Sequence, residues 1–243
     1  MDHIHQSVGA QTENLSTQLF EREWRIYRKV VDNNYSFHRE TYRELHRILT
    51  AEAPKPFRFL DLACGDASMT SEALRGTQIA HYHGIDLSQA ALDLARKALA
   101  ALPCPIELER RDYVEAVCQH RSPVDVVWIG FSLHHLQRPA KLALMQDIRG
   151  LLARGGLFLM CEPAGPDNED RDEWLNRFER QNRPLWTALT TEETDAVMSH
   201  VRAADFPETS SGWLALGRNA GFSDVKEVLV TPDDLHRMYF LRA

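Results

Sequence analysis

The ten residues from Arg58 to Ala67 constrain this chain more than any other stretch. They read Arg-Phe-Leu-Asp-Leu-Ala-Cys-Gly-Asp-Ala, a short apolar strand that ends at an acid and runs into a glycine-bearing turn. A second strand-like run ends at Asp86, 25 residues after Asp61. That spacing is typical of a βαβ nucleotide-binding unit, whose second acid binds a ribose. The two acids therefore predict a site for an adenosine-containing cofactor.

With these motifs the chain resembles the class I S-adenosylmethionine-dependent methyltransferases. Their first motif is an acid followed by alternating glycines, and their second is an acid at the end of the second strand. The resemblance continues in order through residues 111–113, 124–136 and 152–159. Ala63 and Ala67 stand where the family most often has glycine. Alanine is the smallest replacement and still tolerates a close ligand.

The resemblance implies S-adenosyl-L-methionine as the cofactor and S-adenosyl-L-homocysteine as its product. Asp86 is expected to accept hydrogen bonds from both ribose hydroxyls, and Gly65 to let the backbone approach the methionine portion. A dinucleotide would instead favour a G-x-G-x-x-G turn without the anion-repelling Asp66. The residues predicted to bind the cofactor are Asp61, Ala63, Cys64, Gly65, Asp86, Leu87, Asp112, Tyr113, Gly130 and Phe131.

Apolar runs and helical patterns alternate along the chain, which predicts a doubly wound, mostly parallel α/β sheet with helices on both faces. The resemblance raises the expected number of strands to seven, with the last strand antiparallel. The predicted strands are residues 57–62, 79–85, 106–110, 124–130, 157–161, 225–231 and 237–241. Ser88 is a good N-cap for the helix that follows the second strand.

Two segments lie outside this alternation. Residues 16–50 carry apolar and aromatic side chains at helical spacing, so we expect an amphipathic helical cap at 1–55 before a methyltransferase domain at 56–243. Residues 163–211 are longer than a crossover needs and predict a helical lid. The predicted substrate-binding residues are Trp24, Tyr27, Tyr35, His38 and Glu162. Aromatic residues at helical spacing are equally explained by packing, and Glu162 by capping the turn that follows it.

A sulfonium methyl is already activated, so the protein mainly has to align the acceptor and exclude water. A general base is required only if the acceptor must lose a proton. His134 and His135, just beyond the fourth strand, and His38 from the N-terminal segment are the predicted catalytic residues. A buried structural histidine explains the His134–His135 pair equally well.

Composition narrows the possible partners. A formal net charge of −7 argues against sequence-independent binding of nucleic acid, which needs a positively charged face. The four cysteines show no metal-ligand spacing, so we predict no metal site. The unpaired pattern of these cysteines and the lack of a signal-peptide pattern favour a location in the reducing cytoplasm. No apolar run is long enough to cross a membrane. A monomer or a homodimer is expected.

These observations favour methyl transfer by in-line displacement to an N, O or S atom of a small molecule. One alternative is a protein- or RNA-directed methyltransferase, which needs an open, charged groove. Another is a scaffold subunit that binds the cofactor without turnover, for which Ala63 and Ala67 are the only sequence support.

Overall fold

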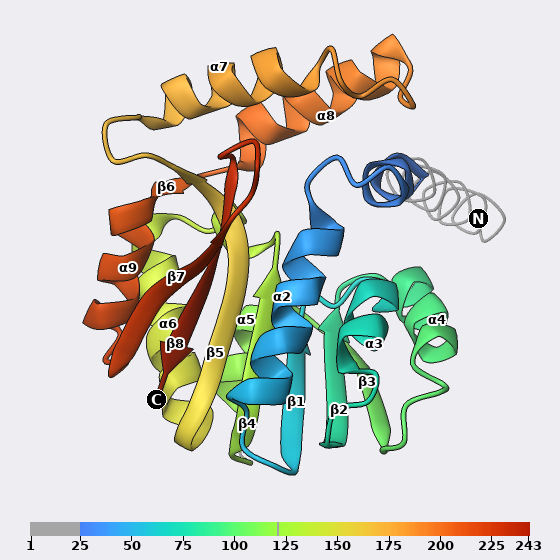
Figure 1. Cartoon of the computed structure of the whole chain (residues 1–243), viewed down its shortest axis with the longest axis vertical. Helices are drawn as coiled ribbons and strands as arrows, with labels where there is room; N and C mark the ends of the chain where they lie inside the picture. The colour runs from blue at the N-terminus through green and yellow to red at the C-terminus, as the bar shows by residue number, and fades with distance from the viewer. Residues whose placement is uncertain (1–24, 121) are drawn as a thin grey trace, which may run out of the picture.

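A single twisted sheet organises the molecule, and a computed structural model describes it over residues 25–120 and 122–243. Its main path runs in the order β3-β2-β1-β4-β5-β8-β7, as Figure 1 shows. The first five strands are parallel, and β8 runs antiparallel to both β5 and β7. The strands are β1 (Phe57–Leu62), β2 (Ile79–Asp86), β3 (Ile106–Arg110), β4 (Val124–Gly130), β5 (Leu152–Gly165), β7 (Asp224–Val230) and β8 (His236–Arg242).

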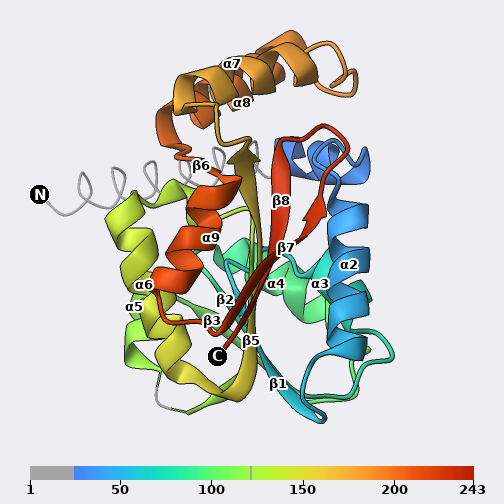
Figure 2. The same cartoon turned by 60° about the vertical axis from the view of Figure 1, so that its left-hand side comes forward.

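Helices cover both faces of this sheet (Figure 2). One face packs against α2 (His38–Ala51), α3 (Ser68–Leu74) and α4 (Gln89–Ala98). The other packs against α5 (Tyr113–Gln119), α6 (Arg138–Leu151) and α9 (Ser210–Asn219). The continuously apolar β4 lies between the two cores because both of its faces are covered. The doubly wound sheet of seven long strands is therefore confirmed, with the last strand antiparallel.

Two helices of the insertion form a separate layer above the carboxyl ends of the parallel strands (Figure 1). They are α7 (Arg171–Asn182) and α8 (Thr191–Ala204), and each begins with a capping box, at Asp170 and Thr190 respectively. A third apolar cluster joins these helices to the helical residues 25–32. These two insertion helices with their connection, called the lid below, thus pack against the N-terminal segment.

The N-terminal segment is broken where the sequence pattern predicts helix throughout. Within the described part it is helical at residues 25–32 and again in α2, with a turn between them. Asn34 and Phe37 in that turn both have φ of 56°. The Asn34 side chain accepts a hydrogen bond from the Arg39 backbone amide at 2.9 Å, a local bond that competes with continued helix. The break lets the first part lean on the lid while α2 stays on the sheet.

Two further differences concern the sheet. β5 extends well beyond the predicted residues 157–161 because Gly155, with φ of 76°, lets the strand continue through an irregular register opposite β4. A two-residue strand, β6 (Glu208–Thr209), pairs with the end of β5 and has no counterpart in the sequence prediction. The pairing of β6 with Ala164 and Gly165 joins the segment after the lid to the end of β5.

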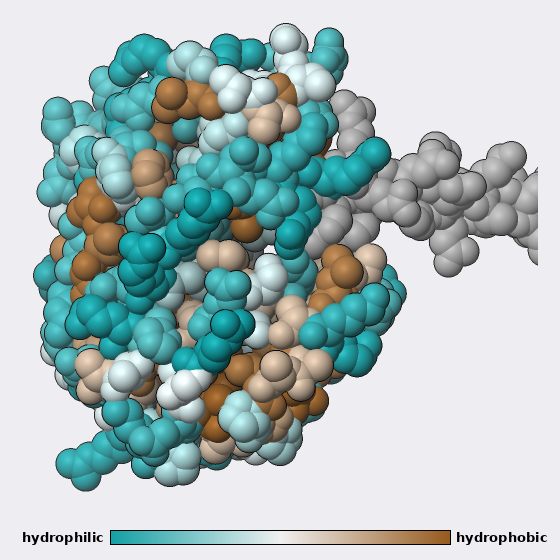
Figure 3. Space-filling view, turned by 45° about the vertical axis from the view of Figure 1, so that its right-hand side comes forward, coloured by the Kyte–Doolittle hydropathy of each residue, from teal (hydrophilic) through white to brown (hydrophobic). Residues whose placement is uncertain are grey.

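The surface is predominantly hydrophilic on the face shown in Figure 3, where hydrophobic side chains form separate patches. Across the described ranges, none of the helices combines the length and the apolar character that a bilayer crossing requires.

The packing of α9 gives a test of the fold. A Cβ at Gly217 would lie 2.6 Å from Leu241 Cδ2 and 2.8 Å from Val225 Cγ1. We expect Gly217→Ala to lower the free energy of unfolding by about 1–3 kcal/mol, because overpacking outweighs the gain in helix propensity. Chemical denaturation measures this change.

Gly150→Ala is the matched control, since Gly150 lies in α6 with open space where a Cβ would be. It should raise the free energy of unfolding by about 0.5–1 kcal/mol. Equal effects of the two substitutions would contradict the close approach of α9 to the sheet.

Candidate functional site

The turn after β1 holds an alternation of left-handed residues. Ala63, Gly65 and Ala67 have φ of 54°, 55° and 50°. The two alanines therefore adopt the backbone conformation that glycine favours, so the departures noted in the sequence leave the loop shape intact. A Cβ at Gly65 would meet nothing within 4 Å. The backbone at Gly65 consequently faces open space that a ligand can fill.

Asp86 at the end of β2 ties this turn to the next one. Its Oδ2 accepts the Gly65 backbone amide at 2.9 Å and its Oδ1 accepts the Ser88 amide at 2.8 Å. Each carboxylate oxygen keeps a second acceptor position, so a diol can still bind. Burial raises the pKa of Asp86 even though these amides oppose the rise.

Asp61 lies beneath the same turn and is only 1% exposed. The hydroxyl of Tyr82 donates a hydrogen bond to its Oδ2 at 2.7 Å. Burial raises the pKa of Asp61 to about 7, and the neighbouring charge of Asp86 adds to the rise. A cation bound at this turn would favour the ionised carboxylate.

The turn after β3 lies on the same edge of the sheet. Asp112 caps α5, with Oδ1 accepting the amides of Val114 at 2.8 Å and Glu115 at 3.2 Å. The Tyr113 hydroxyl donates to the Ser132 carbonyl at 3.4 Å, which connects this turn to the one after β4. Leu87 is 63% exposed and offers an apolar surface beside Asp86. The four loops after β1, β2, β3 and β4 therefore meet, as the sequence predicts.

Glu162 of β5 holds the turn after β4. Its side chain is fully buried, and Oε1 accepts the backbone amides of Ser132 at 3.2 Å and Leu133 at 2.9 Å. Its Oε2 accepts the His134 amide at 3.2 Å and lies 2.7 Å from His134 Nδ1. These contacts are made with the turn after β4, not with the turn that follows Glu162, and Glu162 does not line the neighbouring cavity.

A cavity of about 350 Å³ lies between this turn, the helical residues 25–32 and the lid. The lid contributes the aromatic rings of Trp174, Phe178 and Trp186. The remaining wall includes Phe131 and five histidines, namely His38, His134, His135, His200 and His236. No lysine or arginine of the described ranges lines it. The cavity is therefore apolar with imidazole groups as its main polar feature.

His38 forms part of the floor of this cavity and is only 2% exposed. Its ring lies 4.5 Å from that of Phe131, centroid to centroid, and 6.2 Å from that of Tyr27. Burial lowers the pKa of His38 to about 3, with the nearby His236 adding to the effect. The imidazole is consequently neutral at physiological pH.

His135 and Asp205 face each other at the cavity wall. His135 Nδ1 lies 3.4 Å from Asp205 Oδ1 and 3.3 Å from the Ala204 carbonyl oxygen. Burial opposes a charge on either group. The contact with Asp205 nevertheless raises the pKa of His135. The nearby His135 and His134 lower the pKa of Asp205.

The remaining predicted residues divide into three groups. Tyr27 lines the cavity, whereas Tyr35 stacks on Trp186 at 5.8 Å and does not line it. Cys64 is buried beside the first turn, and Gly130 ends β4 against the Trp128 ring. Trp24 lies outside the described residues.

Sequence reasoning did not single out several residues of the cavity. Asp205, His200 and the lid aromatics come from the insertion, and His236 begins β8. Their positions follow no local motif. The only available signal was the presence of two of the five tryptophans, Trp174 and Trp186, in a segment expected to form a lid.

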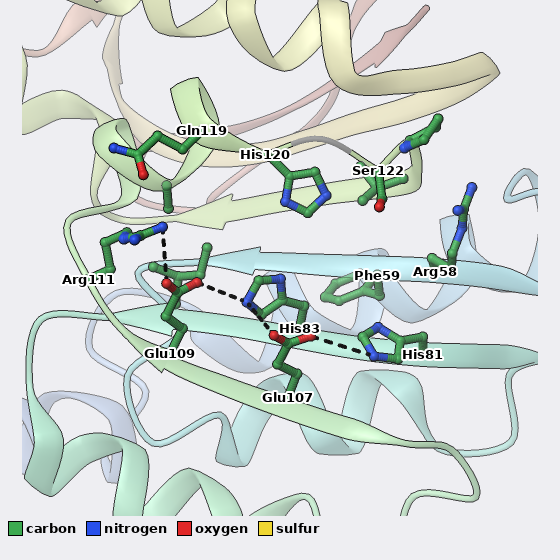
Figure 4. Close-up of a pocket in the computed structure, with 14 residues that line it drawn as sticks. Arg58, Phe59, His81, His83, Glu107, Glu109, Arg111, Gln119, His120 and Ser122 are labelled. Atoms are coloured by element: carbon green, nitrogen blue, oxygen red, sulfur yellow. Dashed lines mark ion pairs between the residues drawn. The ribbon is translucent and has the colours of Figure 1, made fainter.

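A second cavity, of about 530 Å³, lies over β1, β2 and β3 and below the loop after α5 (Figure 4). It is polar. His83 Nε2 lies 3.4 Å from Glu109 Oε2, and His81 Nε2 lies 3.9 Å from Glu107 Oε2. Although this cavity is larger, none of the predicted site residues lines it, and we place the chemistry in the first.

The role of Glu162 can be tested by Glu162→Gln. An amide keeps one acceptor oxygen but turns an NH2 group toward donors, so we expect the free energy of unfolding to fall by about 2–4 kcal/mol. Urea denaturation measures the change. Glu192→Gln, at the exposed start of α8, is the control and should stay within about 0.5 kcal/mol. A similar small effect at both positions would show that Glu162 does not hold the turn.

Comparison with known proteins bears on this geometry. Residues 59–156 match a family model described as a methyltransferase domain. The carboxy-S-adenosyl-L-methionine synthase of Campylobacter curvus (strain 525.92) is 24% identical over 140 residues, which cover 56% of this chain and 57% of that protein. The chain thus matches a little over half the length of this curated relative.

Solved structures share the fold at low identity. An O-methyltransferase family protein from Burkholderia thailandensis superposes with a TM-score of 0.63 and 16% identity, covering 88% of this chain and 59% of that one. The magnesium protoporphyrin IX methyltransferase of Synechocystis PCC 6803, solved with bound S-adenosylmethionine, superposes with a TM-score of 0.56 and 14% identity. The match covers 92% of this chain and 90% of that one. Residues 59–156 thus match a methyltransferase domain, and these solved structures show that the chain shares the fold of S-adenosylmethionine-dependent methyltransferases.

Proposed function

We propose that this protein transfers a methyl group from S-adenosylmethionine to an N, O or S atom of a small, largely apolar molecule. The observation that carries the proposal is the cavity of about 350 Å³, which shares Phe131 and His134 with the turn after β4. An acceptor bound there lies next to the edge of the sheet where the cofactor-binding turns meet.

The residues at that edge suit the cofactor. We assign Asp86 to the ribose hydroxyls, Gly65 to the methionine portion, and Asp112 with Tyr113 to the adenine. S-adenosylmethionine carries a net positive charge, which the acidic side chains of Asp61 and Asp86 favour. When bound, the cofactor supplies an activated methyl group, so the protein has to orient the acceptor and keep water away.

The cavity wall provides that orientation. The lid aromatics and Phe131 offer flat apolar surfaces, while neutral imidazoles offer hydrogen bonds. Of the two roles predicted for His38, we favour substrate binding, because a group with pKa of about 3 is a poor proton acceptor at neutral pH. His134 and His135 face the same cavity and stay the predicted catalytic residues.

The alternatives fit less well. A protein or RNA substrate needs an open, charged groove, whereas this cavity lies under a lid and no described lysine or arginine lines it. Ala63 and Ala67 keep the left-handed loop, which removes the sequence support for a scaffold without turnover. The likeness to a carboxy-S-adenosyl-L-methionine synthase leaves modification of the cofactor itself as the outcome to exclude. We further propose a cytoplasmic monomer or homodimer.

Removing the ribose contact should abolish cofactor binding. Asp86→Ala deletes two charge-assisted hydrogen bonds, so we expect affinity for S-adenosylmethionine to fall at least about 100-fold by calorimetry. Asp93→Ala, on the exposed face of α4, should leave affinity unchanged. Retained affinity in a folded Asp86→Ala protein would overturn our placement of the ribose.

Cofactor affinity should also depend on pH through Asp61. Its pKa of about 7 in the free protein means that, below pH 7, a cationic ligand must displace a proton. Affinity for S-adenosylmethionine should therefore rise by roughly fivefold between pH 6 and 7, by less than about twofold between pH 7 and 8, and level off above that. Asp61→Asn should flatten this dependence. Parallel profiles for the two proteins would place the titrating group elsewhere.

The reaction itself is tested by incubating the protein with S-adenosylmethionine and a panel of small aromatic hydroxyl, amine and thiol compounds, followed by mass spectrometry. Formation of S-adenosylhomocysteine together with an acceptor heavier by one methyl group is expected. A Trp186→Ala variant should lose activity by weakening acceptor binding while keeping cofactor affinity. A carboxylated cofactor, or cofactor binding without any product, would replace the proposal.

A further inference from the structure

Three potential metal ligands converge at the wall of the acceptor cavity. The ligand atoms of His134, His135 and Asp205 lie within 4.8 Å of one another, and no other such cluster occurs in the described ranges. Asp205 follows α8 in the lid, whereas the histidines belong to the turn after β4. The fold therefore brings together, from segments far apart in the sequence, a donor set that the sequence alone does not predict.

The separations match those of ligands around one ion. Asp205 Oδ1 lies 3.5 Å from His134 Nε2 and 3.4 Å from His135 Nδ1. Both distances exceed the usual 2.7–3.2 Å range of a hydrogen bond of this kind. Ligands held about 2.0–2.1 Å from a tetrahedral zinc ion lie about 3.3–3.4 Å apart. Asp205 Oδ1 thus lies at a distance from each imidazole nitrogen that suits a shared ion.

His134 is also held as a metal-binding histidine usually is. Its Nδ1 lies 2.7 Å from Glu162 Oε2, and this contact leaves Nε2 directed toward Asp205. A carboxylate on the far nitrogen fixes the tautomer and the ring orientation and makes the other nitrogen a better donor. Because Glu162 also accepts three backbone amides, this orientation is built into the turn.

The surroundings of Asp205 also suit a bound cation. It is 5% exposed, and its Oδ1 has no hydrogen-bond partner among the described residues. Lysine and arginine side chains of these ranges make no ion pair with it. This buried oxygen faces two imidazole nitrogens at 3.4 and 3.5 Å, and a cation held between the three atoms would stabilise its charge.

We propose that His134 Nε2, His135 Nδ1 and Asp205 Oδ1 bind a divalent transition-metal ion such as zinc. Two imidazoles and one carboxylate leave an open coordination position, as in catalytic zinc sites, and here that position faces the cavity. On the proposed methyltransferase function, the open position would take an oxygen or nitrogen of the acceptor. The histidines would then act through the ion instead of as bases.

Calorimetric titration of the chelator-treated full-length protein with ZnCl2, in the absence of cofactor and acceptor, tests the site. We expect one ion per chain, and a visible absorption band typical of tetrahedral coordination when CoCl2 replaces zinc. Asp205→Asn should weaken zinc binding at least 100-fold. His135→Gln, at a more exposed position, is a second variant in case Asp205→Asn fails to fold.

His83→Gln is the matched control because His83 belongs to the second His–Glu cluster (Figure 4). It should leave zinc affinity unchanged. Loss of zinc binding in His83→Gln but not in His135→Gln would place the ion in the other cavity. If the unmodified protein binds no zinc, His135 and Asp205 share only a proton. Either result overturns the proposal. Zinc binding is measured without turnover, so a failure of the methyltransferase assay does not affect this test.

Discussion

The four hydrogen-bonding contacts at the buried carboxylate of Glu162 are the constraint on which the acceptor side of the molecule depends. They gather three consecutive backbone amides and one imidazole around the end of β5. The turn after β4 is consequently rigid, and it carries both Phe131 and the histidine pair. Burial removes water as a competing donor, so the carboxylate's contacts are made within the protein. Glu162 therefore fixes the wall of the cavity that lies opposite the lid.

The helical residues 25–32 connect the two halves of the site. Arg28 pairs with Asp66 of the first cofactor-binding turn at 2.7 Å, and Lys29 pairs with Glu193 of the lid at 2.6 Å. Between these two contacts, Tyr27 lies against His38 and lines the cavity. One short segment therefore touches the cofactor-binding turn, the acceptor cavity and the lid. A substitution in this segment is therefore in position to affect both proposed binding sites.

Local patterns were sufficient to predict the sheet but not the cavity. Each long strand is an apolar run, and residues such as Asp86 and Asp112 mark where strands end and caps begin. The sequence prediction missed the extension of β5 because this extension depends on a glycine conformation that permits a bulge. It missed the break at Asn34 because the spacing of side chains there is helical, although the backbone forms a turn. Asp205, His200 and His236 could not be assigned, since their roles arise only when the lid folds back over the strand ends. Propensity and periodicity describe neighbours in sequence, whereas this cavity is made of neighbours in space.

The ties made by Arg28 and Lys29 differ in kind from the apolar contacts beside them. Both cations are 38% exposed, and the attraction between exposed charges is screened over about 8 Å at physiological ionic strength. The stacking of Tyr35 on Trp186 is insensitive to such screening. A higher salt concentration is therefore expected to weaken the ion pair between Arg28 and Asp66, while the apolar contacts between the N-terminal segment and the lid stay unchanged. Ionic strength is thus expected to act on the Arg28–Asp66 contact more than on the apolar contacts beside it.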